Sequence, residues 1–583
     1  MIKTLAKSLR EHKKGSILTI ILSILEAAFE ILIPLCMADI IDKGIDLGEM
    51  SAVWKYGIAL LIFAALQLFT GVLSAHIAAK TSVGFSANLR QDMYDNVQTF
   101  AFSNIDKFST ASIVTRLTTD VTNIQNSYQM LIRMAIRGPI MLIFSMSVAF
   151  SINSSIAWIF LAIIPIMAGL LILIVRKVHP VFNRVFRTYD ELNNVVQENV
   201  RSIRVVKSFN QEDNEIMKFK GISESIYRDF AKGERLLAFN SPIMQFFMYA
   251  SMILISWIGA KAIIVSGNNA TFGMTTGDLT AMFAYAMQIL MSLMMLSMVF
   301  AMMTISLASA RRIAEILDEK TDIANPEDPE MSVKDGSIRF EGVDFVYASK
   351  ADKKVLDSIN LSIASGETIG IIGGTGSSKS SLVQLIPRLY DVTGGRLTLG
   401  GVDVRSYDLI VLRNAVAMVL QKNELFSGTI KENLRWGNEN ATDEEIEHAC
   451  RLACADEFIQ GFPGKYDTYI EQGGTNVSGG QKQRLCIARA LLKKPKVLIL
   501  DDSTSAVDTK TDASIQRAFA EYIPDITKII IAQRISSVQH ADQIIVLDDG
   551  KVVAVGRHTE LLKNCDIYRE VYASQKKGGA EHE

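Results

Sequence analysis

Long apolar runs alternate with mixed polar stretches along the first half of the chain. Runs long enough to cross a bilayer as helices lie at residues 15–38, 57–79, 134–152, 155–175, 242–265 and 279–306. The third run is short and includes Arg137, so the pattern does not fix where that helix begins. The first run is too long for a secretory signal, and no small-residue cleavage site follows it. The pattern therefore predicts six membrane-spanning helices, the first of them retained.

Two long polar-apolar stretches separate these spans, residues 80–133 and residues 176–239. Both are rich in helix-forming residues and mix apolar with polar positions at helical spacing. We expect them to be helical arms that continue the membrane helices and turn near 106–112 and 209–215, where small and polar residues interrupt the pattern. A separate soluble subdomain is the alternative.

Lysine and arginine are distributed unevenly among the loops. The N-terminus and both long arms carry many, whereas residues 39–56, 153–154 and 266–278 carry few. Because Lys and Arg concentrate on the cytoplasmic side of membrane proteins, both termini and both arms are expected in the cytoplasm. The prediction is a multi-pass protein of the cell membrane.

The second half has the alternating strand and helix pattern of a soluble α/β protein. Residues 319–336 are polar, contain two prolines and are expected to form a linker. The expected organisation is a membrane α-helical domain over residues 1–318 and a cytoplasmic α/β P-loop domain over residues 337–573. Residues 574–583 are expected to be a flexible tail.

Composition and charge narrow the possible partners. Of 583 residues, 49% are hydrophobic, more than a soluble enzyme usually contains, so the lipid bilayer is an expected partner. The net charge is −2 and no polybasic tract occurs, so no nucleic-acid partner is expected. Five scattered cysteines include Cys450 and Cys454 one helical turn apart, but no second pair completes a zinc site. Free thiols are expected.

Two features inside the predicted spans have open interpretations. Glu26 and Glu30 share one helix face, and carboxylates within a membrane are costly. They contact a cationic substrate, or they pair with a basic or polar group or lie near the headgroups. The last span carries a methionine stripe at helical spacing: Met287, Met291, Met294, Met298 and Met302. Such a face suits an adaptable binding surface, or it serves ordinary packing or lipid contact.

A glycine-rich loop lies between a strand and a helix in "ETIGIIGGTGSSKSSLVQLI", residues 367–386. A phosphate-binding loop has the pattern Gly-x-x-x-x-Gly-Lys-Ser, whose backbone N–H groups and following helix N-terminus surround phosphates. Here Ser378 replaces the second glycine, which we expect to be tolerated if its backbone is helical rather than left-handed. The loop consists of Gly373, Gly374, Thr375, Gly376, Ser377, Ser378, Lys379, Ser380 and Ser381.

A second motif, "NVSGGQKQRLCIARALL" (476–492), opens a helix and is followed by the strand "KVLILDD". This succession resembles the ATP-binding cassette family, and the six spans with two long arms resemble its exporter branch. The resemblance implies that Tyr347 stacks on adenine, that residues 373–381 form the Walker A loop, and that Gln421 is the Q-loop glutamine. It also implies that Asp501 ends the Walker B strand and that Asp508 belongs to the D-loop. The signature motif would be Val477, Ser478, Gly479, Gly480 and Gln481, with Val where Leu is usual.

The resemblance also implies ATP and Mg²⁺ as cofactors. Lys379 would contact the β- and γ-phosphates, and Ser380, Gln421 and Asp501 would complete the Mg²⁺ shell. In the family two cassettes meet head to tail, so each ATP lies between one chain's Walker loops and the signature of the other. The signature of this chain would therefore serve the site of its partner.

Two residues depart from the family pattern at the catalytic positions. Asp502 stands where the family's general base is a glutamate, and Gln533 stands where its switch histidine is expected. A displacement of roughly 1 Å costs about a hundredfold in rate, and an amide cannot accept a proton at neutral pH. This site is therefore expected to occlude ATP and hydrolyse it slowly.

These departures predict a heterodimer with a second half-transporter that carries the catalytic Glu and His. The expected substrates are hydrophobic or amphipathic small molecules, of the multidrug type. An exporter of a defined lipid or peptide, and an ATP-gated regulator or channel subunit with little hydrolysis, are the alternatives.

Overall fold

The chain folds into two compact units in a computed structural model. The structure describes residues 1–269, 273–347, 353–502 and 507–580. The first unit comprises Met1–Gln98 and Thr110–Glu319, and the second comprises Thr99–Ser109 and Lys320–Glu583. The short segment Thr99–Ser109 therefore belongs to the second unit, although the sequence analysis placed it in the membrane domain.

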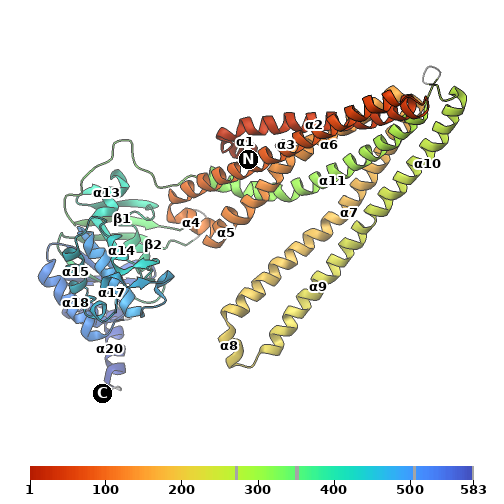
Figure 1. Cartoon of the computed structure of the whole chain (residues 1–583). Coiled ribbons are helices and arrows are strands. Elements are labelled where there is room, and N and C mark those ends of the chain that lie inside the picture. Colours follow the sequence, from red (N-terminus) through yellow and green to blue (C-terminus); the bar gives the residue numbers. More distant parts are fainter. Residues whose placement is uncertain (270–272, 348–352, 503–506, 581–583) are drawn as a thin grey trace. The chain divides into compact units, whose positions relative to one another are not determined.

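The first unit is entirely helical (Figure 1). Its main helices are α1 (Ile2–Lys7), α2 (Lys13–Asp39), α3 (Met50–Gln98), α5 (Thr110–Thr115), α6 (Val121–Ile152), α7 (Ser154–Arg201), α8 (Ile203–Ser208), α9 (Glu212–Ala238), α10 (Asn240–Ser266) and α11 (Thr276–Asp318). Among the described residues, six helical stretches, which include α2, α3, α6, α7, α10 and α11, are long and apolar enough to cross a membrane. The six predicted spans are confirmed.

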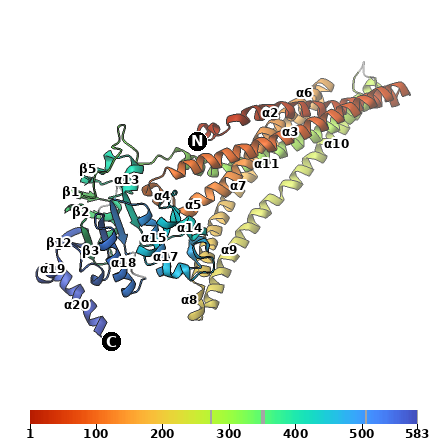
Figure 2. The same cartoon turned by 60° about the vertical axis from the view of Figure 1, so that its left-hand side comes forward.

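The two arms are helical and continue the membrane helices, with short breaks near their turns. Helix α3 runs unbroken to Gln98 and α7 to Arg201, well beyond the predicted spans. Helices α7 and α9 pack side by side, with Phe182 and Phe230 edge to face at 5.6 Å between ring centroids (Figures 1 and 2). The chain reverses at Ser109 and near Asn210, both with positive φ, so the two predicted turning points are confirmed.

Helices α2, α6 and α11 share an apolar core and several polar contacts. The core residues are Ala27, Ile31, Ala38, Met141, Ala281 and Tyr285. The Tyr285 hydroxyl donates to the Ile31 carbonyl at 2.8 Å. Between α6 and α11, the Ser145 hydroxyl donates to Gln288 at 3.1 Å, and Ser127 bonds Ser306. Hydrogen bonds of this kind join helices where lipid provides no hydrophobic driving force.

The second unit is built on two principal sheets. The smaller has the order β2-β1-β4-β5, with β1 (Ile338–Phe345), β2 (Leu356–Ile363), β4 (Gly394–Leu399) and β5 (Val402–Asp403), all antiparallel. The larger has the order β12-β11-β3-β10-β9-β6, with β3 (Thr368–Gly373), β6 (Val416–Val419), β9 (Val497–Asp501), β10 (Thr527–Ile531), β11 (Gln543–Asp548) and β12 (Lys551–Gly556). Five of its strands are parallel and β12 is antiparallel. A short pair, β7 (Gly428–Thr429) and β8 (Tyr469–Ile470), completes the described strands.

Both faces of the larger sheet are buried. On β10, Ile529 and Ile531 belong to the core shared with the smaller sheet, while Ile530 belongs to the core on the helical side. Successive residues of a strand face opposite ways, so a strand covered on both faces must be apolar throughout. This explains the continuous apolar run that ends at Asp501.

The helices of the second unit are mostly short. They are α4 (Phe102–Phe108), α12 (Lys379–Gln384), α13 (Leu409–Ala415), α14 (Ile430–Arg435), α15 (Asp443–Leu452), α16 (Asp456–Gln460), α17 (Gly479–Leu492), α18 (Thr509–Tyr522), α19 (His558–Asn564) and α20 (Asp566–Ala580). Helix α20 continues to Ala580, so most of the expected flexible tail is helical. Glu330, in the expected linker, pairs with Tyr407 through its backbone, so this stretch lies on the second unit.

Candidate nucleotide-binding site

The parallel strands bring distant parts of the sequence to one edge of the larger sheet. Ile371 on β3 pairs with Ile531 on β10, and Ile531 pairs with Asp501 on β9. Because the carboxyl ends of parallel strands meet at the same edge, the segments that follow them converge there. These segments carry the glycine-rich loop after β3, Asp502 after β9, Gln533 after β10 and Gln421 after β6.

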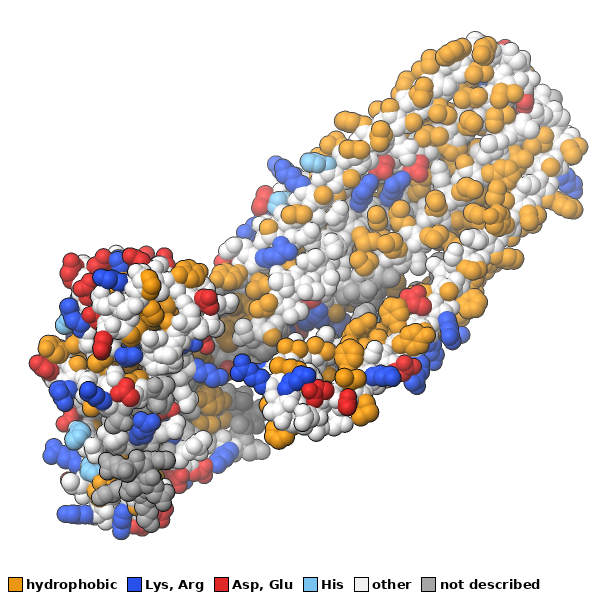
Figure 3. All heavy atoms as spheres, turned by 60° about the horizontal axis from the view of Figure 1, so that its bottom comes forward, with side chains coloured by type: hydrophobic (Ala, Val, Ile, Leu, Met, Phe, Trp, Pro, Cys, Tyr) orange, Lys and Arg blue, Asp and Glu red, His pale blue; other side chains and the backbone are white. Residues whose placement is uncertain are grey.

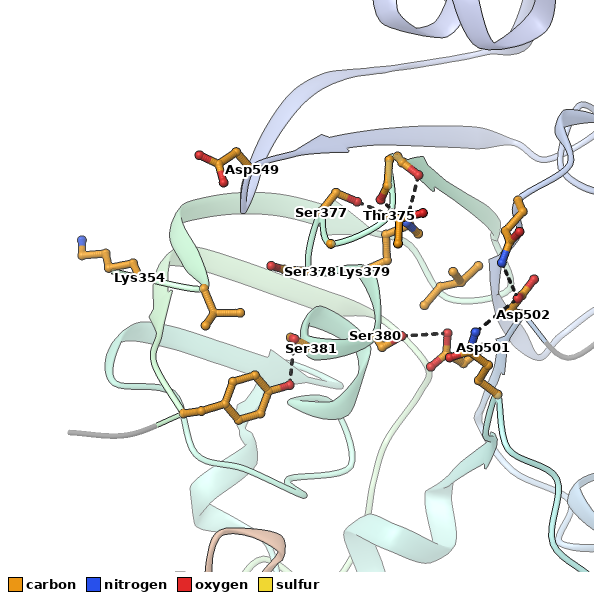
Figure 4. Close-up of a pocket in the computed structure, with 18 of the residues that line it drawn as sticks. Lys354, Thr375, Ser377, Ser378, Lys379, Ser380, Ser381, Asp501, Asp502 and Asp549 are labelled. Carbon is orange, nitrogen blue, oxygen red and sulfur yellow. Dashed lines mark hydrogen bonds between the residues drawn. The ribbon is translucent and has the colours of Figure 1, made fainter. Parts of the chain in front are cut away.

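The glycine-rich loop encloses the ammonium group of Lys379. Its Nζ donates to the Gly373 and Gly374 carbonyls at 2.9 and 2.8 Å, and lies 3.2 Å from the Ser377 hydroxyl (Figure 4). A Cβ on Gly373 would lie 2.2 Å from the Leu547 carbonyl oxygen, so only glycine fits there. Burial lowers the pKa of Lys379 from its usual value. The arrangement places one positive charge within a ring of backbone groups, as phosphate binding requires.

The expectation for Ser378 is wrong. Its backbone is left-handed, with φ 71° and ψ 23°, rather than helical. The loop must turn here so that its N–H groups face inward before α12 begins, and this turn requires positive φ. A residue with a Cβ adopts this conformation at a cost of about 1 kcal/mol. The loop therefore forms with its usual geometry, and Ser378 is strained within it.

Two oxygen groups lie together at the base of the loop. The Ser380 hydroxyl donates to Asp501 Oδ1 at 3.0 Å, and Asp501 is 3% exposed (Figure 4). Burial raises the pKa of this carboxyl above its usual value. A hydroxyl and a carboxylate are the hard oxygen ligands that Mg²⁺ prefers, with phosphate oxygens supplying the rest of its shell. Among the described residues no group of three His, Cys, Asp or Glu side chains is placed to hold a metal.

Asp502 is held by both side-chain amides of the site. Gln533 Nε2 donates to Asp502 Oδ2 at 2.8 Å, and Gln421 Nε2 lies 3.5 Å from the same oxygen (Figure 4). Burial raises the pKa of Asp502, and the two amide contacts oppose that rise. The backbone of Asp502 also has positive φ, with its N–H bonded to the Ile531 carbonyl at 3.0 Å. The carboxylate is thus fixed by donors that cannot take a proton.

These groups line a pocket of about 780 Å³. Tyr347 lies at one side, and its hydroxyl is 2.8 Å from the Ser381 hydroxyl (Figure 4). The sequence analysis missed several lining residues: Lys353, Lys354, Val355, Ile531, Asp549 and Val571. The Lys353–Lys354 pair stands close after Tyr347 in the sequence and was a readable signal of an anion site, whereas nothing marked Val571.

The second motif forms the N-terminus of α17, away from this pocket. The Ser478 hydroxyl accepts from the Gln481 N–H at 3.3 Å, and the Gln481 side chain accepts from the Ser478 N–H at 2.9 Å. This reciprocal capping box leaves Ser478 and Gly479 exposed while Val477 is buried beneath them. None of the described residues that line the pocket comes from this motif.

Known families match the two units in turn. Residues 16–294 match the model of the ABC transporter transmembrane region, and residues 356–505 match the model described as ABC transporter. The chain is 36% identical over 561 residues to the uncharacterized ABC transporter ATP-binding protein YfiB of Bacillus subtilis, covering 96% of each. The chain belongs to the ABC transporter family.

Two further relatives carry names that state a transported molecule. This chain is 31% identical to the fatty acid ABC transporter ATP-binding/permease protein of Mycobacterium bovis, over 91% of this chain and 82% of the relative. It is 33% identical to the ATP-dependent lipid A-core flippase of Desulfotalea psychrophila, over 88% of this chain and 89% of the relative. A bacterial Atm1-family ABC exporter solved with ATP bound shares the fold, with TM-score 0.82, 24% identity and coverage of 97% and 99%.

One unit of the transporter thus gathers the predicted Walker A, Walker B and Q-loop residues, with Tyr347 and Gln533, around one pocket. Asp508 lies outside the residues that line it and instead caps α18, where its side chain accepts from the Thr511 N–H at 2.9 Å. Residues 503–506, between Asp502 and this cap, lie outside the described residues.

An aromatic cluster joins the pocket of the transporter to helix α4. Tyr347 and Tyr390 lie edge to face at 5.1 Å, and Phe102 of α4 lies 6.0 Å from Tyr390. The Tyr390 hydroxyl donates to Asp106 of α4 at 2.8 Å. Helix α4 stands in the sequence between the membrane helices α3 and α6. The cluster therefore links the Tyr347 side of the pocket to a segment inserted between two membrane helices.

Proposed function

We propose that this ABC exporter half drives the export of hydrophobic or amphipathic compounds by alternating access, as the degenerate-site half of a heterodimer. Its own pocket holds ATP and hydrolyses it slowly. Its signature completes the competent site of the partner half, which carries the catalytic Glu and His. The observation that carries the proposal is the hydrogen bond from Gln533 to Asp502, which replaces a His–Glu pair by two groups poorly suited to base catalysis.

The chemistry of the pocket supports binding more strongly than hydrolysis. Lys379 supplies a charge for the phosphates, and Ser380 and Asp501 supply oxygen ligands for Mg²⁺. Bound Mg²⁺ would neutralise phosphate charge and orient the phosphates. A general base contributes about 10²–10⁴ in rate, and a short carboxylate fixed by Gln533 delivers little of this.

The exposed signature supports a second chain in the assembly. Ser478 and Gly479 present a helix N-terminus to the outside of the unit, and no described residue of this motif lines the chain's own pocket. A helix N-terminus of this kind suits a phosphate held by another cassette. An ATP-gated regulator is a weaker alternative, because a protein that only binds nucleotide does not need a signature motif that completes a hydrolytic site in a partner.

A defined lipid cargo is the second candidate. It is favoured by the two relatives named for a fatty acid and for lipid A-core, both of them amphipathic molecules. A multidrug exporter and a lipid exporter would use the same membrane helices. The two hypotheses differ only in how selectively those helices bind a substrate.

The proposal is tested on the transporter purified from its native membrane with its second half. Asp502→Ala should leave more than half of the ATP hydrolysis, while Ser478→Arg, which blocks the neighbouring site, should remove it. ATP-driven uptake of a hydrophobic dye into inside-out vesicles should likewise persist in Asp502→Ala and be lost in Ser478→Arg. If Asp502→Ala abolishes hydrolysis, the degenerate assignment is wrong, and ion conductance without uptake would favour the regulator.

A further inference from the structure

Four charged side chains meet within the membrane helices. Glu26 and Glu30 of α2 face Arg133 and Arg137 of α6. Arg137 bridges both carboxylates, with Nη1 3.0 Å from Glu26 and Nη2 2.5 Å from Glu30. Figure 3 shows acidic and basic side chains gathered within the largely apolar surface of the membrane helices. Of the two interpretations of the glutamates, pairing with a basic group is the one observed.

The pairing leaves one cation and one carboxylate oxygen incompletely matched. Arg133 Nη2 lies 4.0 Å from Glu26 Oε1, beyond hydrogen-bond distance. The other oxygen of Glu26, Oε2, is buried and has no hydrogen-bond partner among the described residues. The Glu26 side chain is 7% exposed and that of Arg133 is 26% exposed. Glu30 and Arg137 are similarly exposed, at 25% and 22%, but they pair with each other. Arg133 is the accessible group of the four whose printed contact lies beyond hydrogen-bond distance, and the natural ligand of a guanidinium is an anion.

The position of Arg133 along α6 fits the edge of a bilayer. Nineteen residues separate it from Ile152, where the helix ends. At about 1.5 Å per residue this is about 28 Å, close to the hydrocarbon thickness of about 30 Å. Arg133 thus lies near the end of the span that the loop charges assign to the cytoplasm, at the depth of a lipid headgroup.

The methionine stripe of α11 begins at the same level. Helices α6 and α11 run antiparallel, with Ser127 opposite Ser306 and Ser145 opposite Gln288. By this register Arg133 is level with residue 300, just beyond Met298. The stripe then continues along α11 towards the far side of the membrane, and its members Met287, Met291, Met294 and Met298 are 44%, 72%, 45% and 61% exposed. An exposed, flexible apolar track of this kind accepts an acyl chain of any shape.

We propose that Arg133 and the methionine stripe form a binding site for an amphiphile with an anionic head group, a carboxylate or a phosphate. Arg133 pairs with the head group, and the tail lies along Met298 to Met287. The Glu26–Arg137–Glu30 bridge holds the site in place, and Arg133 stands beside it, 4.0 Å from Glu26 Oε1. The proposal names a substrate class for the export function above and rests on it.

A cationic occupant fits this site less well. Both carboxylates already pair with Arg137, and the Oε2 oxygen of Glu26, which has no hydrogen-bond partner among the described residues, is buried. An ammonium ion would have to displace Arg137 while standing beside Arg133. An anion has only to approach a partly exposed guanidinium, whose planar fork matches carboxylate and phosphate oxygens.

Binding to the full-length chain in neutral-lipid nanodiscs, without ATP, tests the site independently of transport. Laurate, lauryl phosphate, dodecanol and dodecylammonium are titrated and followed by thermal shift. The two anions should bind most tightly, and Arg133→Gln should weaken both about tenfold or more while leaving dodecanol unchanged. Comparing laurate with lauryl phosphate tells which anion the site prefers. Arg133→Lys should keep part of the anion binding, and Met291→Ser should weaken all tail-bearing ligands.

Arg311→Gln, an exposed arginine of α11 beyond the stripe, is the matched control and should change nothing. The site is refuted if dodecylammonium binds most tightly, if no ligand binds saturably, or if Arg133→Gln leaves the anions unaffected. Anion binding that survives a failure of ATP-driven uptake would overturn the export function while supporting the site.

Discussion

Two serines of the second unit each precede a helix in a predicted phosphate-binding motif, and their backbones differ. Ser378 caps α12 in a left-handed conformation and makes no side-chain cap, whereas Ser478 caps α17 in an extended conformation with a complete capping box. The regions around the two serines also differ in how many residues depart from the family pattern. The Walker pocket carries Ser378, Asp502 and Gln533, all departures from the family pattern, while the signature region has only Val477 in place of Leu. Most departures from the family pattern therefore lie in one of the two regions.

The largest expected effect is on ATP binding, and it is tested by replacing one lysine in each of the two regions. Lys379→Ala should weaken ATP binding at least about a hundredfold, because the only cation inside the phosphate loop is lost. Lys482→Ala removes a lysine that bonds the Gly473 carbonyl beside the signature, and should leave ATP binding of the isolated chain unchanged. The ATP-induced rise in melting temperature measures both. An undiminished rise in Lys379→Ala would mean that nucleotide binds elsewhere.

The next prediction compares the two serines. Ser378→Gly should stabilise the unit by about 1 kcal/mol, because glycine adopts positive φ without strain. Ser478→Ala should destabilise it by about 1 kcal/mol, because the capping box is lost. Ser478→Asn keeps a capping group and serves as the control. Chemical unfolding measures all three, and shifts of the same sign for Ser378→Gly and Ser478→Ala would contradict the contrast.

The smallest expected effect depends on pH and on two aspartates with opposite shifts. The pKa of Asp501 is raised by burial, so its charge destabilises the folded state, and this penalty is present at neutral pH and fades as pH falls through the raised pKa. Asp501→Asn should therefore raise the nucleotide-free melting temperature at neutral pH, and the gain should shrink on acidification.

Asp508 has a pKa lowered by its hydrogen bond from the Thr511 N–H, so its charge stabilises the fold at neutral pH. Asp508→Asn should lower the melting temperature at neutral pH, and this loss should shrink as pH falls towards the lowered pKa. Melting curves across the acidic to neutral range compare the two variants. A gain for Asp508→Asn would contradict the assignment of its cap.

Most of the fold could be predicted from the sequence because its signals are long or repeated. Six apolar runs and the helical spacing of the arms predicted the membrane helices, and the apolar run before Asp501 predicted a strand, which the structure confirms as β9. The site residues of the Walker A loop, with Asp501 and Gln421, also lie together as expected, since parallel strands share one edge.

What could not be predicted depends on contacts between distant segments. Arg137 was visible in the sequence, but its bond to Glu30 requires α2 and α6 to be neighbours. The left-handed backbone of Ser378 follows from the loop closing around Lys379, not from any preference of serine. The association of Thr99–Ser109 with the second unit rests on Tyr390, nearly three hundred positions away.

The central claim, that this pocket retains ATP and hydrolyses it only slowly, is tested most directly by the chemical state of occluded nucleotide. The transporter is purified with its second half, whose own phosphate-loop lysine is replaced by alanine so that it binds no nucleotide. It is incubated with radiolabelled ATP and Mg²⁺, freed of unbound nucleotide, and the retained label is resolved into ATP and ADP. The account predicts mostly ATP in the native chain and mostly ADP in Asp502→Glu/Gln533→His, where base and switch are restored. Mostly ADP in the native chain, formed as fast as in the double variant, would contradict it.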